Sequence, residues 1–292
     1  MSQAIGDVLR QAAQRLEQQG IAEPRAAAEV LLADLLNCPR YTLFLKSHHP
    51  LDAAIRERYG ARIERRLQGE PVQYITGSQE FWSLPFAVNP DVLIPRPETE
   101  LLVEHGMRLA QDWAQGHPDQ TLKLLDVGVG SGNVAISLAH SLPQSRVWGI
   151  DVALSAVRVA QANAQCLGVA DRLHWICGDL TTPLQGERVQ FAVCTSNLPY
   201  VTTQEWEQLP RDIKAYEPFG ALCGGGDGLE VIRRLVVQSP GVLAAGGTLL
   251  LEVGWRQAGA VLALIRDRRQ FATSGVWRDY ADIERVVWAQ MP

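Results

Sequence analysis

The residues with the clearest chemical potential lie in a glycine-rich loop, residues 126–132, whose sequence is DVGVGSG. Glycines add little bulk, so a ligand can approach the backbone closely, and the amides at the start of a helix favour an anionic or polar group. Asp151 follows roughly 20 residues later, where a carboxylate can accept hydrogen bonds from both hydroxyls of a ribose. This spacing predicts a cofactor that contains a nucleoside.

The spacing of the glycines leaves two kinds of cofactor open. The loop follows the pattern GxGxG, and Asn133 stands where a dinucleotide-binding fingerprint would place its last glycine. A glycine loop by itself is also found in turns that bind nothing. The loop and Asp151 together predict a nucleoside cofactor, without deciding between a nicotinamide dinucleotide and S-adenosylmethionine.

A second polar segment, Asn-Leu-Pro-Tyr at residues 197–200, follows an apolar stretch. In an open α/β sheet, ligands bind beyond the carboxyl ends of the strands, so we expect this segment beside the glycine loop. An amide or exocyclic amino nitrogen is a poor nucleophile, because its lone pair is delocalised, and hydrogen-bond acceptors must hold it in line for transfer. The Asn197 side-chain oxygen and the Leu198 carbonyl are suitable acceptors. Pro199 restricts the backbone, and the Tyr200 ring offers a face for a planar group.

The segment therefore predicts methyl transfer to a planar nitrogen. Taken in isolation, the same four residues would suit an ordinary turn at the end of a strand equally well. The nearby cofactor loop favours the catalytic interpretation.

The elements that must position these segments are predicted by patterns after residue 101. Apolar, β-branched stretches predict strands at residues 122–127, 147–151, 173–177, 191–196 and 248–253. Helical spacing predicts helices at residues 134–142, 154–167, 229–237 and 257–266. Residues 275–280 and 285–289 predict a strand pair at the sheet edge. The alternation indicates an α/β fold with a mainly parallel, doubly wound sheet covered by helices on both faces.

The chain before this sheet has a different character. Apolar positions at helical spacing predict helices over residues 5–16, 24–35 and 51–67. Residues 74–94 are rich in aromatic and β-branched side chains and are broken by glycine and proline, which predicts a β-hairpin. We therefore predict a helical domain at residues 1–72, a hairpin linker at 73–98 and a sheet domain at 99–292.

The composition narrows the class of protein. Of the 292 residues, 47% are hydrophobic and 20% charged, as in globular proteins, and the net charge of −5 argues against a general nucleic-acid binder. The five cysteines form no CxxC pair and the six histidines show no paired spacing, so we expect no metal. We see no apolar leader and no apolar run long enough for a membrane span. We therefore expect a cytoplasmic protein.

The two polar segments together resemble a known class of enzymes. Residues 126–132, Asp151 and residues 197–200 resemble class I methyltransferases that act on planar nitrogens. Residues 71–103 are similar to the stretch before the catalytic domain in release-factor glutamine methyltransferases, the PrmC/HemK family, and LIPRPETE at 93–100 is a very specific match. Further matches are Tyr216-Glu217-Pro218, Ala221-Leu222, residues 250–255 and residues 278–280.

This resemblance implies a seven-stranded class I methyltransferase domain behind a helical, substrate-recognising domain and a hairpin. It implies transfer of a methyl group from S-adenosyl-L-methionine to the side-chain amide nitrogen, N5, of the glutamine in the Gly-Gly-Gln motif of peptide chain release factors. The implied cofactor-binding residues are Asp126, Gly128, Val129, Gly130, Ser131, Gly132, Asp151, Asp179, Leu180 and Asn197. In this assignment the glycine loop holds the methionine part, Asp151 the ribose, and Asp179 with Leu180 the adenine end.

The resemblance also implies the residues that act on the substrate. The implied catalytic and substrate-binding residues are Asn197, Leu198, Pro199 and Tyr200, with Arg96 and Glu217 as further substrate contacts. Arg96 and Glu98 could equally pin the predicted hairpin to the sheet.

One departure from the family keeps alternatives open. Leu198 stands where the family usually has proline, and the rRNA adenine dimethylases carry the same Asn-Leu-Pro-Tyr. The first alternative is an amino-methyltransferase acting on adenine in nucleic acid, and the second is a non-catalytic cofactor-binding protein. The acidic balance and the hairpin motif favour a release factor as the substrate. We expect a monomer that binds neither nucleic acid nor membranes directly.

Overall fold

The chain is divided into two units, each built from segments that are separated in sequence. The computed structural model describes residues 3–187 and 189–292, so residues 1 and 2 of the predicted helical domain lie outside the described residues. One unit contains residues 3–78 and Pro210–Tyr216, and the other contains Gln79–Leu209 and Glu217–Pro292 apart from residue 188.

The first unit is a bundle of helices around an apolar core. Its helices are α1 (Ile5–Gln18), α2 (Pro24–Leu35), α3 (Arg40–Leu45), α4 (Ala53–Leu67), α5 (Val72–Thr76) and α10 (Arg211–Tyr216). The three predicted helices are present, and residues of their apolar stripes such as Leu16 and Leu31 are fully buried. Asp52 caps α4 by accepting hydrogen bonds from the backbone amides of Ala54 and Ile55. Burial of these stripes holds the short helices together, since isolated helices of this length are marginal in water.

Helix α3 of this unit was not predicted, and neither were helices α5 and α10. Residues 72–76, at the start of the predicted hairpin, form helix α5, which ends at Gly77 in the left-handed conformation. Helix α10 comes from the middle of the sheet domain, yet it packs with the helical unit, where Tyr216 Oη donates to the Gln68 carbonyl at 3.3 Å. Asp212 of the same helix lies 3.9 Å from the buried Arg66 guanidinium.

The predicted hairpin is present but shorter than expected. It consists of β1 (Ser78–Phe81) and β2 (Leu84–Ala87), joined by Trp82 and Ser83. Both turn residues have positive φ, 53° and 58°, as a two-residue hairpin turn of the right twist requires. Non-glycine residues adopt this conformation at a cost. That cost is offset because the Trp82 amide donates to Glu100 at 2.7 Å and its indole donates to Ser141 at 3.0 Å.

The second unit is built on a seven-stranded sheet, counted over the described residues, in the order β5-β4-β3-β6-β7-β9-β8. The strands are β3 (Lys123–Val127), β4 (Arg146–Asp151), β5 (Leu173–Cys177), β6 (Phe191–Ser196), β7 (Leu243–Glu252), β8 (Thr273–Arg278) and β9 (Glu284–Gln290). Strands β3 to β7 are parallel, and β9 pairs antiparallel with β7 and β8. The predicted α/β architecture and its edge pair are confirmed, and β7 begins earlier than predicted.

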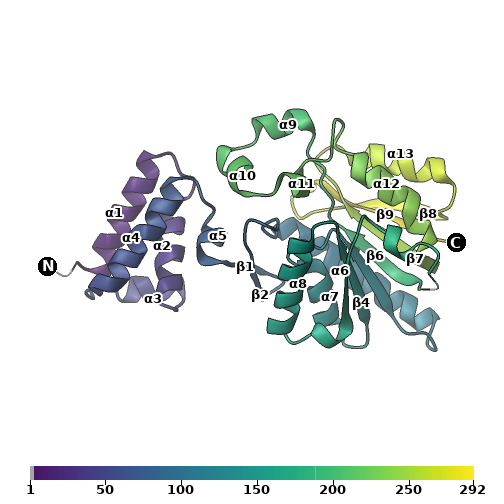
Figure 1. The fold of residues 1–292 in the computed structure, drawn as a ribbon, viewed down its shortest axis with the longest axis horizontal. Helices are drawn as coiled ribbons and strands as arrows, with labels where there is room; N and C mark the ends of the chain where they lie inside the picture. The colour runs from purple at the N-terminus through teal and green to yellow at the C-terminus, as the bar shows by residue number, and fades with distance from the viewer. Residues whose placement is uncertain (1–2, 188) are drawn as a thin grey trace. The chain divides into compact units, whose positions relative to one another are not determined.

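Helices cover both faces of this sheet, as Figure 1 shows. The α-helices of the unit are α6 (Glu100–Gly116), α7 (Asn133–Ser141), α8 (Leu154–Cys166), α9 (Thr203–Gln208), α11 (Phe219–Leu222), α12 (Glu230–Gln238) and α13 (Ala258–Arg268). Short 3-10 helices occur at η1 (Pro97–Thr99), η2 (Ala170–Arg172), η3 (Thr182–Leu184) and η4 (Ser239–Gly241). Helix α6 and the helices α9 to α11 were not predicted.

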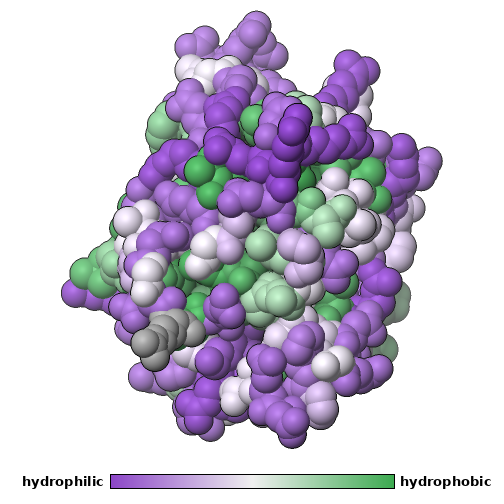
Figure 2. Space-filling model, turned by 90° about the vertical axis from the view of Figure 1, so that its right-hand side faces the viewer, coloured by the Kyte–Doolittle hydropathy of each residue, from purple (hydrophilic) through white to green (hydrophobic). Residues whose placement is uncertain are grey.

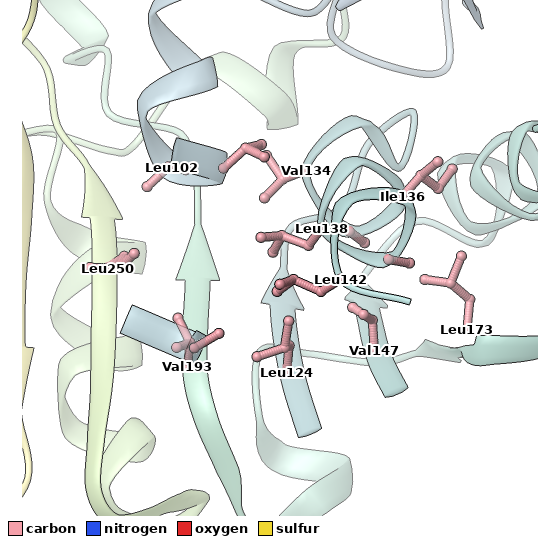
Figure 3. Packing of buried hydrophobic residues seen from close by; sticks show 14 of the residues in the cluster. Leu102, Leu124, Val134, Ile136, Leu138, Leu142, Val147, Leu173, Val193 and Leu250 are labelled. Atoms are coloured by element: carbon pink, nitrogen blue, oxygen red, sulfur yellow. The ribbon is translucent and has the colours of Figure 1, made fainter. Parts of the chain in front are cut away.

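Two apolar cores lie on opposite faces of the sheet because successive strand residues point to opposite sides. Leu124 packs in one core with α6, α7 and α8, and its neighbour Leu125 packs in the other with α12 and α13. Figure 3 shows the first core, where Leu102 and Leu138 from two helices meet Leu124 and Val193 from adjacent strands. Burial on both faces explains the near-continuous apolar sequence of β3 and β6.

The face of the molecule that Figure 2 draws is mainly polar. Hydrophilic side chains cover most of the face drawn in Figure 2, and apolar ones occupy limited areas between them. None of the helices that the structure describes is long and apolar enough to cross a membrane.

Asn163 on α8 ties the hairpin to the glycine loop, and it generates a stability prediction. Its side chain accepts from the Ala87 amide at 2.8 Å and donates to the carbonyls of Ala87 and Ser131 at 3.0 and 2.8 Å. Asn163→Ala should lower the free energy of unfolding by roughly 1–3 kcal/mol, because backbone groups of Ala87 and Ser131 would lose their hydrogen-bond partner. Urea denaturation measures this loss, with the exposed Gln165→Ala on the same helix as control. Equal stability of both variants would contradict the role of Asn163.

Candidate active site

A cavity of about 550 Å³ lies at the carboxyl ends of the parallel strands. Its lining includes the loop after β3, the end of β4, the loop after β5 and the segment after β6. The strand order reverses between β3 and β6, and crevices at such switch points bind ligands in open α/β sheets. The predicted residues that line it are Arg96, Asp126, Gly128, Val129, Gly130, Ser131, Asp151, Asp179, Leu180, Asn197, Leu198 and Pro199. Gly132, Tyr200 and Glu217 lie behind this lining.

The glycine loop is held against β4 by its own backbone. The amides of Gly128 and Val129 donate to the Ile150 carbonyl at 2.8 and 3.2 Å. Gly132 has φ 82°, and a Cβ there would meet Ile136 Cδ1 at 2.8 Å and Ala160 Cβ at 3.0 Å. Only glycine therefore allows the chain to turn into α7 this close to α8.

Asp151 is the last residue of β4 and organises the loop. Its Oδ2 accepts from the Gly130 amide at 3.0 Å and its Oδ1 from the Ala153 amide at 2.9 Å. Burial raises the pKa of this carboxyl, and the hydrogen bonds from Ala153, Gly130 and Val152 oppose that rise. Each carboxylate oxygen retains capacity for a second donor, as two hydroxyls of a ribose require.

Asp126 lies deeper, near the end of β3. Its side chain accepts from Thr195 Oγ1 at 2.8 Å and is almost completely buried. Burial raises the pKa of Asp126 to about 7, and the nearby Asp151 adds to the rise. Asp126 thus lines the cavity and is also anchored to β6.

The Asn-Leu-Pro-Tyr segment begins directly after β6. Asn197 Nδ2 donates to Thr99 Oγ1 at 3.1 Å, and with this orientation the side-chain oxygen can accept from a ligand. The Leu198 side chain is buried against the Gly128 backbone, where an added Cβ would lie 3.2 Å from Leu198 Cδ2. The two predicted segments are therefore in direct contact.

A second glycine run supports this segment from behind. A Cβ on Gly224 would lie 2.4 Å from the Pro199 carbonyl oxygen, and one on Gly228 would lie 2.3 Å from that of Tyr200. The Tyr200 carbonyl also accepts from Gln257 Nε2 at 2.8 Å. The backbone of residues 199–200 thus packs so closely against Gly224 and Gly228 that neither glycine could carry a side chain.

Arg96 and Glu217 form a pair beside the cavity. Arg96 Nη2 lies 2.5 Å from Glu217 Oε1, and the Ile94 amide donates to Glu217 Oε2 at 3.3 Å. The Glu217 side chain is almost fully buried, whereas Arg96 is partly exposed and lines the cavity. Glu217 therefore holds the segment that leads from the hairpin, and Arg96 faces the ligand space.

The far end of the cavity carries Asp179 and Leu180. Asp179 forms an ion pair with Arg234 of α12, which also lines the cavity. Leu180 is buried with φ 50° and presents an apolar wall. Among the residues that the structure describes, no group of three His, Cys, Asp or Glu side chains could hold a metal ion.

Sequence reasoning missed several residues of this site. Thr99 and Arg234 line the cavity, and Glu252 lies behind Thr99 and Tyr200. Thr99 and Glu252 belong to two segments that matched the family, at residues 93–100 and 250–255. No local spacing rule pairs residues so distant in sequence, so only the fold reveals their contact.

Comparisons with known proteins agree with this geometry. Residues 7–77 match the family described as PrmC N-terminal domain, and residues 124–216 match a methyltransferase domain. The chain is 40% identical to the release factor glutamine methyltransferase of Moorella thermoacetica, covering 99% of this chain and 98% of that protein. It is 36% identical to that of Escherichia coli strain K12, covering 95% of each. The chain belongs to the release factor glutamine methyltransferase family.

The solved structures support the fold. The human methyltransferase 10 domain containing protein is similar with a TM-score of 0.52 and 15% identity, covering 82% of this chain and 98% of that chain. The protein is thus a class I methyltransferase, and its cofactor is S-adenosylmethionine.

The cavity fits this cofactor. A Cβ on Gly130 would meet open space, so the loop backbone is accessible to a ligand. Ser131 Oγ is buried without a hydrogen-bond partner among the described residues and lines the cavity, as expected for an atom whose partner is the ligand. Carboxylates, backbone groups and the apolar Leu180 together suit a cationic amino acid joined to a nucleoside.

Asp151→Ala should weaken binding of S-adenosylmethionine by roughly 1–3 kcal/mol, because charged hydrogen bonds to the ribose are lost and Gly130 loses its partner. Calorimetry measures the change in Kd, with the exposed Asp171→Ala as control. Parental affinity in the Asp151 variant would contradict the ribose role of Asp151. Tight binding of a nicotinamide dinucleotide by the parent, without binding of S-adenosylmethionine, would contradict the choice of cofactor.

Proposed function

We propose that this enzyme methylates the side-chain amide nitrogen, N5, of the glutamine in the Gly-Gly-Gln motif of peptide chain release factors. The observation that carries the proposal is the position of Asn197 and Leu198 in the lining of the cavity that also contains the glycine loop. Two acceptors for a planar NH₂ group thus lie beside the cofactor site. The names of its relatives describe the same substrate class.

The roles of the residues follow from the chemistry of an amide. When bound, the cofactor supplies an electrophilic methyl group on a sulfonium centre. The Asn197 side-chain oxygen and the Leu198 carbonyl accept the two N–H groups of the glutamine amide and fix its nitrogen for in-line attack. Once the nitrogen has taken the methyl group, one amide proton would pass to solvent water, and the demethylated cofactor would leave as a neutral thioether.

The remaining residues shape the substrate site. Pro199 fixes the backbone that carries these acceptors, and the Tyr200 ring supports the planar group from behind the lining. Arg96 contacts the substrate, and Glu217 acts indirectly by holding Arg96 and Ile94.

We assign the recognition of the whole release factor to the helical unit. A single glutamine side chain offers too little area for specific binding, since stable protein interfaces bury about 1,200 Å² or more. The helical unit carries Tyr41, Phe44 and Leu45 on α3 with 68%, 76% and 72% exposure. A groove of about 690 Å³ next to them is lined by α1, α2 and α3. Exposed aromatic residues beside a groove are typical anchors for a protein partner.

We further propose a monomer in the cytoplasm that needs no nucleic acid or membrane for its activity. The described cysteines are all free, which suits a reducing compartment where translation factors are found.

Mass spectrometry tests the function directly. The full chain is incubated with isotope-labelled S-adenosylmethionine and an intact release factor, and the modified residue is located by peptide fragmentation. We expect one methyl group on the glutamine of Gly-Gly-Gln. Methylation of adenine in added nucleic acid, with none on the release factor, would overturn the substrate assignment.

Asn197→Ala should lower kcat at least about 100-fold while the Kd of the cofactor stays near the parental value, because amide orientation acts mainly in the transition state. Leu198→Pro is the matched control: it retains the backbone carbonyl and should keep turnover near the parental level. Steady-state kinetics and calorimetry separate the two quantities. Parental turnover in Asn197→Ala would show that the proposed mechanism is wrong.

Substitutions on α3 test the helical unit. Tyr41→Ser with Phe44→Ser should raise KM for the intact release factor roughly tenfold or more, because anchor residues of an interface are lost. Cofactor affinity and the slow methylation of a short Gly-Gly-Gln peptide should not change. Glu57→Ser, exposed on α4, is the control. Point variants are preferable to deletion of residues 1–72, since deletion would also remove the packing partners of α10. An unchanged KM would remove this role from α3.

A further inference from the structure

Glu252 is a buried carboxylate that the methyl-transfer chemistry described so far does not use. It is the last residue of β7, and only 2% of it is exposed. Thr195 and Ser196, which precede Asn197, pair with Leu250 and Leu251, which precede Glu252. The register of two adjacent parallel strands therefore brings Glu252 to the base of the Asn-Leu-Pro-Tyr segment.

Two hydroxyl groups converge on this carboxylate. Tyr200 Oη lies 3.4 Å from Glu252 Oε1, a long hydrogen bond. The Thr99 hydroxyl is close enough to lower the pKa of Glu252 by hydrogen bonding. The second oxygen, Oε2, is buried and has no hydrogen bond of good geometry among the described residues. A buried carboxylate is stabilised by hydrogen-bond donors. A hydroxyl near Glu252 therefore points its proton toward the carboxylate.

The ionised Glu252 determines which groups of Thr99 and Asn197 act as donor and as acceptor. An ionised carboxylate only accepts hydrogen bonds, so we infer that the Thr99 hydroxyl beside Glu252 turns its proton toward it. The Thr99 oxygen is then available as an acceptor, and it receives the Asn197 NH₂ group at 3.1 Å. With its nitrogen engaged, the Asn197 amide has its oxygen left for the cavity.

We propose that Glu252 is a positioning residue that, through Thr99 and Tyr200, orients the Asn197 amide so that its oxygen accepts a hydrogen bond from the substrate. This inference rests on the proposed methylation of a glutamine amide and deepens it. Glu252 is not among the residues that line the cavity, so its effect passes through other side chains. The Asn197 amide can adopt two orientations, which exchange its NH₂ donor and its oxygen acceptor. Glu252 selects the orientation in which the oxygen faces the cavity.

The ionisation of Glu252 makes this orientation sensitive to pH. Burial raises its pKa to about 7, while Thr99, Arg285 and Tyr200 lower it and the nearby Glu98 raises it. Arg285 is itself paired with Asp279 at 3.3 Å. Below about pH 7 the carboxyl is protonated and becomes a donor, so Thr99 is free to donate to Asn197 instead. The Asn197 amide then loses its fixed orientation, and turnover falls as the pH decreases.

The first test compares the kcat of variants at Glu252 and Thr99 at pH 8. Glu252→Gln and Thr99→Val should each lower kcat at least about tenfold and leave the Kd of the cofactor unchanged, because only the amide acceptor is misplaced. Thr99→Ser keeps the hydroxyl and should restore most of the activity. Glu104→Gln, an exposed glutamate on α6, is the control for the charge change. Parental kcat in both Glu252→Gln and Thr99→Val would overturn the proposal.

The second test needs no substrate, and its deciding measurement is made on the parent protein. Asp126 also has a pKa of about 7, so the pH dependence of the rate does not identify the titrating group by itself. The side-chain amide resonances of Asn197 in ¹⁵N-labelled protein, assigned with Asn197→Ala, should titrate between about pH 6 and about pH 8, and this titration should disappear in Glu252→Gln. Constant resonances in the parent would overturn the proposal.

The two proposals fail in distinguishable ways. If the parent does not methylate the glutamine of a release factor, the proposed function is wrong, whatever the Asn197 resonances show. If the parent methylates that glutamine but the Asn197 amide does not respond to pH or to Glu252→Gln, only the role of Glu252 is wrong.

Discussion

The site depends on one constraint, the shared direction of strands β3 to β7. Because parallel strands end at the same edge, the residues that follow them come together however far apart they are in sequence. Asp151 ends β4, Asn197 follows β6 and Glu252 ends β7. The reversal of strand order between β3 and β6 opens the edge at the point where the glycine loop meets Leu198. Burial of both sheet faces keeps these strand ends in register.

This arrangement gathers carboxyl groups in a poorly solvated region, which weakens the fold. Asp126 and Glu252 are buried, and burial raises the pKa of each to about 7. The folded protein therefore holds these protons more tightly than the unfolded chain does. The free energy of unfolding is therefore higher in acid, where both groups are protonated, and it decreases as the pH rises toward about 7. Such a cost is typical of functional sites, where charge is positioned for a ligand.

The helical unit is linked to the catalytic segment by the chain itself. After Tyr200 the chain passes through α9 and then supplies α10, which packs within the helical unit. It returns to the methyltransferase unit at Glu217, the residue that holds Arg96. The segment between Tyr200 and Glu217 thus belongs partly to the unit that we propose recognises the substrate.

The sequence alone determined what depends on neighbours in the chain. The glycine loop, Asp151 and residues 197–200 were predicted because each follows a recognisable strand, and residues 93–100 carried the resemblance to the family. The tertiary structure decided the contacts between distant residues. The pairing of Arg96 with Glu217, the membership of α10 in the helical unit and the hydrogen bond from Asn197 to Thr99 depend on strand register and packing. No local pattern encodes these contacts, because their energy arises only when separate segments bury one another.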